Sequence, residues 1–201
     1  MAKSNEAEPI VFRKVRTPPK INDPILGFCK ALSPLAPEYV NLKRVPGALE
    51  DECFPNVSGY VKTHGGSIQY GWTVWEKQYL YLEAEFHACV RDGDRLFDVT
   101  PKRDGEQTVL FLPDPVAVWD EKRVPNRFES LSDNPLAVEY TAVQRALSEE
   151  KCRVLGDKFG KQNIDIANLR EVERLSILQT DLEGRLSQLK SADLKRQRRG
   201  V

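Results

Sequence analysis

Two segments of the chain alternate between apolar and polar residues with the period of a β-strand. Residues 67–75 place four apolar side chains on one face: Ile68, Tyr70, Trp72 and Val74. Residues 81–91 place small and apolar side chains on one face and polar ones on the other, the latter being Glu83, Glu85, His87 and Cys89. Asp92-Gly93 follows, and Asp-Gly between two alternating runs indicates a tight hairpin. We therefore predict an antiparallel strand pair that continues into residues 95–100, with one more strand over 108–112.

Helical patterns lie on both sides of these strands. Residues 51–66 have an acidic start, a proline within the first turn and a final glycine pair, which are helix start and stop signals. Cys53 then lies at the N-terminus of the helix. Further helices are expected near residues 24–32 and 135–155. The last forty residues carry an apolar stripe at steps of three and four, typical of a long amphipathic helix over about 165–195, made of Leu169, Val172, Leu175, Leu178, Leu182, Leu186 and Leu189.

Proline content divides the chain into regions. Seven of the 13 prolines lie in the first fifty residues, and proline is excluded from helix interiors and central strands. We expect residues 1–45 to form a Pro-rich arm that partly wraps the core. Residues 46–125 are predicted to form a small α+β core of a helix packed on an antiparallel sheet. Residues 126–201 form a helical C-terminal region.

Composition excludes several classes of protein. Lys+Arg and Asp+Glu both number 30, so the formal net charge is zero and no global field attracts nucleic acid or an anionic membrane. No run approaches the ~20 apolar residues of a membrane span, and the first residues lack the pattern of a secretory signal. We therefore expect a cytoplasmic protein, with the basic end at 195–199 as a solvated tail. The four cysteines have no paired short spacings, which favours free thiols, and no cofactor is predicted.

A cluster of reactive side chains follows from the predicted hairpin. If Asp92 and Gly93 are its two loop residues, His87 lies directly opposite Asp98, and opposed side chains project to one face ~4.5–5.5 Å apart. An aspartate there fixes the tautomer and orientation of the histidine. Cys53 is the candidate nucleophile, because a helix N-terminus favours a thiolate.

The sequence also offers candidates for the oxyanion donors and for the substrate cleft. The backbone N–H of Cys53 is one candidate donor to an oxyanion, and Asn41, Tyr39 and Gln69 are all candidates for the second. Trp75 and Gln69 share a strand face, so we expect both to line a substrate cleft. Glu85 is either a solvated residue or a group that selects a basic substrate.

Two motifs carry a family resemblance. Glu85-Phe86-His87-Ala88, followed by Asp98-Val99-Thr100-Pro101, resembles the transglutaminase-like group of the papain-like superfamily, in which the chain order is Cys, His, Asp. The longer run from Cys53-Phe54-Pro55-Asn56 through Gly71-Trp72 to the same motifs is also similar to poorly characterised bacterial and phage proteins. The resemblance covers residues 46–115. It implies a small papain-like core and acyl transfer through a thioester, with Cys53 as nucleophile, His87 as general base and acid, and Asp98 as orienter.

The chain departs from the pattern at Cys89, where an aromatic residue is usual, and at Val99, where proline is common. Three alternatives stay open. In the first, His87 and Asp98 form an ordinary cross-strand ion pair. In the second, zinc is bound by four side chains: Cys53, His64, His87 and Cys89. In the third, the chain is a non-catalytic interaction module that forms a homo-oligomer or binds a partner protein through residues 165–195.

Overall fold

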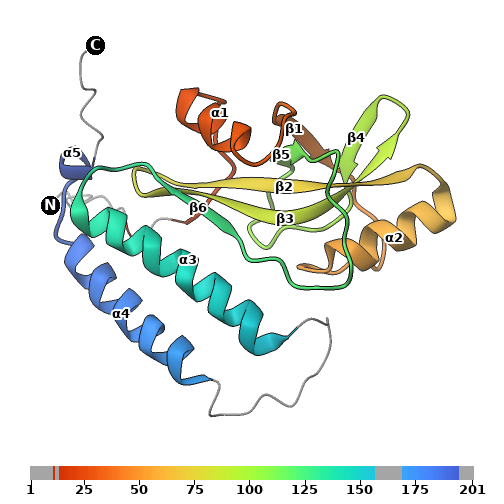
Figure 1. Cartoon of the computed structure of the whole chain (residues 1–201). Helices are drawn as coiled ribbons and strands as arrows, with labels where there is room; N and C mark the ends of the chain where they lie inside the picture. The colour runs from red at the N-terminus through yellow and green to blue at the C-terminus, as the bar shows by residue number, and fades with distance from the viewer. Residues whose placement is uncertain (1–10, 12–13, 157–168, 195–201) are drawn as a thin grey trace, which may run out of the picture. The chain divides into compact units, whose positions relative to one another are not determined.

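The structure is a computed structural model that describes residue 11 and residues 14–156 and 169–194. Their helices and strands, in chain order, are α1 (Asp23–Lys30), β1 (Glu38–Leu42), α2 (Cys53–His64), β2 (Ser67–Lys77), β3 (Tyr81–Asp92), β4 (Arg95–Asp98), β5 (Thr108–Pro113), β6 (Arg127–Ser130), α3 (Pro135–Leu155), α4 (Arg170–Leu186) and α5 (Ser191–Leu194) (Figure 1). The protein is therefore of mixed α+β type, as predicted. Its described residues divide into two compact units: a barrel unit of residues 17–75 and 84–124, and a helical unit whose described residues lie within 1–16, 76–83 and 125–201.

Five strands close into a barrel. The sheet order is β2-β5-β1-β4-β3-β6, and β2 also pairs with β3, which returns the first five strands to their starting point. β1 pairs with β4 in parallel and with β5 in antiparallel orientation. Gly71 permits the close approach of β2 to β5, because a Cβ atom there would collide with the Leu112 carbonyl oxygen and the Phe111 ring.

The strands of the barrel are apolar on both faces. The outer face packs against α2 in a cluster that includes Phe54, Val57, Ala88 and Val90. The alternate residues point inward and form a second cluster, of Val40, Cys89, Val109 and Phe111. Because strand side chains alternate between faces, the His87 side chain points inward with Cys89. Its ring centroid lies 6.3 Å from that of Phe111.

The helical unit has a core of its own. Figure 1 shows α3 and α4 running side by side in opposite directions. The leucines of the α4 stripe at positions 175, 182 and 186 are buried against α3 residues that include Tyr140 and Leu147. The Tyr140 hydroxyl donates a 2.8 Å hydrogen bond to Glu183 Oε1. The buried leucines of the apolar stripe therefore pack inside this unit.

Several element predictions are confirmed, and one is wrong. The helices expected at 24–32 and 135–155 are present as α1 and α3, with Asn22 and Asn134 as their N-caps. The single helix expected over 165–195 is instead α4 followed by a break at 187–190 and the short α5, while residues 165–168 and 195 lie outside the described residues. β1, within the expected arm, and β6 were not predicted.

Candidate active site

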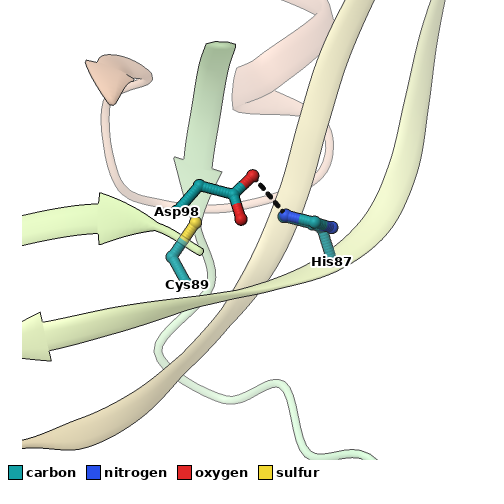
Figure 2. A group of neighbouring side chains, drawn as sticks. All are labelled: His87, Cys89 and Asp98. Atoms are coloured by element: carbon teal, nitrogen blue, oxygen red, sulfur yellow. Dashed lines mark hydrogen bonds and ion pairs between the residues drawn. The ribbon is translucent and has the colours of Figure 1, made fainter. Parts of the chain in front are cut away.

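A buried ion pair joins β3 to β4. His87 Nε2 and Asp98 Oδ2 lie 2.8 Å apart, and the two side chains are 4% and 0% exposed. Figure 2 shows one ring nitrogen of His87 turned toward Asp98 and the other turned away from both Asp98 and Cys89. An ionised carboxylate can only accept hydrogen bonds, so Nε2 carries the proton of this bond. Nδ1 is the nitrogen left to act on another group.

The hairpin register differs from the prediction. The observed pairs are Asp92 with Arg95 and Val90 with Phe97, so Gly93 and Asp94 form the loop rather than Asp92 and Gly93. Gly93, with φ of 58°, takes the first loop position, where a type II′ turn accepts glycine. The predicted direct opposition of residues 87 and 98 is therefore wrong.

His87 and Asp98 still come together, because the observed register differs from the predicted one by two residues and both side chains stay on the same face of the sheet. If the observed register is continued, Cys89 lies opposite Asp98. His87 lies two residues before Cys89 on β3, further from the hairpin loop. A displacement of two residues keeps a side chain on the same face of a sheet. His87 thus reaches Asp98 diagonally.

Asp98 has two further partners. The backbone N–H of Thr100 donates to Oδ1 at 2.8 Å, and the Lys102 ammonium group lies 2.8 Å from Oδ2. Lys102 Nζ is also 3.5 Å from His87 Nε2. Lys102 was not predicted, because it lies in an irregular segment after β4 and no periodic pattern points to it. Asp98 is consequently held by a histidine, a lysine and a backbone amide.

These contacts set the charges of the pair. Burial by itself lowers the pKa of His87, but the charge and the hydrogen bond of Asp98, together with the interaction with Cys53, more than offset this, so the pKa lies well above its ordinary value. Burial by itself raises the pKa of Asp98, and attraction to His87 and Lys102 brings it well below its usual range. Both groups are therefore charged near neutral pH.

Cys53 is the first residue of α2, as predicted. Its side chain is 7% exposed and belongs to the outer-face cluster with Val57 and Val99. Electrostatic interaction with Cys53 is one of the smaller contributions to the raised pKa of His87. No hydrogen bond joins the two side chains among the interactions of the described residues.

The side chain of Asn56 ties the start of α2 to the end of β4. Its amide accepts from Leu49 N at 3.1 Å and donates to Leu49 O at 2.7 Å. It also donates to the Thr100 hydroxyl at 3.3 Å. Because Thr100 is itself bonded to Asp98, Asn56 links the turn that carries Cys53 to the segment that holds Asp98.

Cys89 lies closer to the pair but is chemically different. His87, Cys89 and Asp98 each offer a metal-ligating atom, and these atoms lie within 4.8 Å of one another. Burial raises the pKa of the Cys89 thiol to about 11, so it stays protonated near neutral pH. The Lys102 ammonium group and the His87 imidazolium both already bind Asp98 Oδ2. His64, from the alternative zinc set, is exposed and stacks on Tyr60 at 4.4 Å, so that set is not brought together.

The residues expected to line a substrate cleft or to donate to an oxyanion make other contacts. Trp75 Nε1 donates to Glu85 Oε2 at 3.1 Å. Gln69 donates to the Tyr70 carbonyl at 2.8 Å and accepts from Arg91 at 3.2 Å. Asn41 accepts a 3.2 Å bond from Thr108, and the Tyr39 hydroxyl donates to the Pro18 carbonyl at 2.7 Å.

A cavity of about 310 Å³ lies in the barrel unit. It is lined by residues 42–45, 99–102 and 105–107. Lys102 is therefore shared between the cavity and the ion pair. Val45 and Val99 line the cavity and also belong to the cluster of Cys53. The cavity thus borders both the charged pair and the surroundings of the thiol.

No protein-family model, curated protein or solved structure matches the chain. None of the described helices has the length and apolar character needed to cross a lipid bilayer.

Proposed function

We propose that this chain is a cysteine-dependent acyl-transfer enzyme, with Cys53 as nucleophile, His87 as general base and acid, and Asp98 as orienter. The 2.8 Å contact between His87 Nε2 and Asp98 Oδ2 carries the proposal. It supports an orienting role because it leaves Nδ1 as the nitrogen that exchanges a proton. The high pKa of His87 favours an imidazolium, whose positive charge would stabilise a thiolate at Cys53.

The chemistry proceeds through a thioester. The Cys53 thiolate attacks an amide carbonyl carbon, and the carbonyl electron pair moves onto oxygen. When this intermediate collapses, the C–N bond breaks and Nδ1 of His87 protonates the leaving nitrogen. Nδ1 then takes a proton from the incoming water or amine, which attacks the thioester and releases the thiolate. Water gives hydrolysis or deamidation, and an amine gives transamidation.

We also propose that the barrel and α2 form a reduced transglutaminase-like core of the papain-like superfamily. The chain order Cys53, His87, Asp98 supports this, as does the position of the cysteine at the start of a helix packed on the strands. The substrate acyl group enters, in this proposal, through the cavity of about 310 Å³. Its aliphatic lining at Val45 and Val99 lies in the cluster that contains Cys53.

Thiol labelling tests the proposal. An ordinary thiol of pKa ~8.5 is almost fully protonated at pH 6. We expect iodoacetamide to label Cys53 at pH 6 about tenfold faster than Cys152, a partly exposed thiol on α3, measured by peptide mass spectrometry. His87→Gln should remove this excess, and His64→Gln, at the other histidine, should not. A Cys53 that labels no faster than Cys152 would overturn the proposal.

A non-catalytic interaction module is the second candidate function. Ile177 of α4 lies outside the apolar stripe and is 66% exposed, and this exposed apolar side chain is the observation that favours this candidate. Ile177→Lys should then abolish self-association or partner binding, as measured by light scattering after size-exclusion chromatography. An unchanged mass for the variant and the native chain counts against self-association through α4.

A further inference from the structure

The environment of His87 contains a second cation that the proposed reaction has not used. Four titratable groups on the surrounding elements interact electrostatically with His87: Asp98 from β4, Lys102 from the segment after it, Cys53 from α2 and Cys89 from β3 itself. Lys102 is the only permanent cation among these four. Its side chain is 12% exposed, so its charge is poorly screened by solvent.

We propose that Lys102 is a positioning residue of this site, which divides the charge of Asp98 between two cations by binding the same carboxylate oxygen as His87. The two nitrogens each lie 2.8 Å from Asp98 Oδ2 and 3.5 Å from each other. The other oxygen, Oδ1, is taken by the Thr100 amide at 2.8 Å. The carboxylate is therefore fixed in its rotation, and His87 can meet only one of its oxygens.

The charge of Lys102 has a consequence for the acid–base role of His87. With Asp98 as its only charged neighbour, His87 would hold its proton strongly. This keeps the imidazolium charged but hinders its action as a general acid, which must release the proton. Repulsion from the lysine 3.5 Å away weakens that hold and lowers the pKa of His87 relative to the histidine–aspartate pair alone. This inference rests on the proposed function for its catalytic meaning. Its physical content, the coupling of Lys102 to His87, does not.

The chain suits a direct measurement, because it has only two histidines. The imidazole signals of His64 and His87 can be followed by NMR from pH 5 to 10 and assigned with His64→Gln. Lys102→Met, which keeps the length of the side chain and removes its charge, should raise the pKa of His87 by about one pH unit. Lys102→Arg keeps the charge and should leave the titration closer to the native one than Lys102→Met does. An unchanged His87 titration in a folded Lys102→Met variant would overturn the proposal.

A measurement on the native side chains covers the case in which Lys102→Met does not fold. The ammonium signal of Lys102, observed by ¹⁵N NMR, should exchange slowly with water and shift as His87 titrates. An ammonium group in fast exchange that ignores the His87 titration contradicts the proposal. Repeating the titration with Cys53→Ala separates the two proposals. Coupling of Lys102 to His87 persists there if this inference holds, whatever the labelling of Cys53 reveals about acyl transfer.

Discussion

The barrel unit and the helical unit differ in how deeply their ion pairs are buried. The barrel unit encloses an imidazole and a carboxylate, which are 4% and 0% exposed. The helical unit has a core of leucines and aromatic rings, and the ion pairs among its described residues are more exposed; the side chains of Arg174 and Glu171, for example, are 62% and 45% exposed. Surface pairs contribute little to stability, whereas a buried charge depends on its partner. The two units should therefore respond differently to mutation and to pH.

The two responses can be observed separately. All three tryptophans, Trp72, Trp75 and Trp119, belong to the barrel unit. Tryptophan fluorescence thus reports unfolding of the barrel unit, while far-UV circular dichroism at 222 nm is weighted toward the long helices α3 and α4. Comparing the two signals in urea shows which unit a mutation affects.

Removal of the buried carboxylate should have the largest effect. Asp98→Ala leaves His87 and Lys102 without their shared partner, and breaking a buried pair in this way costs about 3–5 kcal/mol. We expect the urea midpoint of the fluorescence transition to fall accordingly. Asp92→Ala is the matched control on the same hairpin, because its ion pair with Arg95 is 51% and 80% exposed. Equal effects of the two variants would mean that burial of Asp98 has no energetic consequence.

Truncation of the helical core should be the next largest effect. Leu182 is 0% exposed, and replacement of a buried leucine by alanine costs about 2–5 kcal/mol. Leu182→Ala should lower the urea midpoint of the circular dichroism signal. Ile177→Ala, on the same helix but 66% exposed, should change it by less than about 0.5 kcal/mol. A smaller effect of Leu182→Ala than of Ile177→Ala would contradict the packing of α4 described above.

The effect of pH should be smaller and confined to the barrel unit. The pKa of His87 is raised in the folded state, so its contribution to stability is complete below its unfolded pKa of ~6.5 and is lost as pH rises through the folded value. The pKa of Asp98 is lowered, so its contribution is complete above ~3.9 and is lost as pH falls through the folded value. The barrel unit should be most stable between about pH 4 and 6.5.

The alkaline decline can be assigned to one residue. The fluorescence-detected free energy of unfolding should fall above about pH 6.5 by at most about 1.4 kcal/mol per pH unit. His87→Gln should flatten this decline, and His64→Gln should preserve it. A decline of the same slope in His87→Gln would assign it to other groups.

Local signals in the sequence predict the elements well but their contacts less well. α3 begins at Pro135 behind the Asn134 cap, and both signals are adjacent in the chain. β1 spans five residues and depends on partners more than fifty residues away, which no local pattern reveals. The hairpin was visible, but its register depends on whether glycine takes the first or second loop position. Lys102 joins the site through loop geometry alone.

The link made by Asn56 limits how the chain can be divided. One amide holds residues 49 and 100 together with the first turn of α2, so the segment of residues 49–56 and the distant Thr100 share a single anchor. A break within residues 50–52 separates Leu49 from that anchor, so a split version of this protein is expected to reassemble poorly there. The loop at Gly93 and Asp94, which closes by backbone pairing and an exposed ion pair, is the better place for new termini.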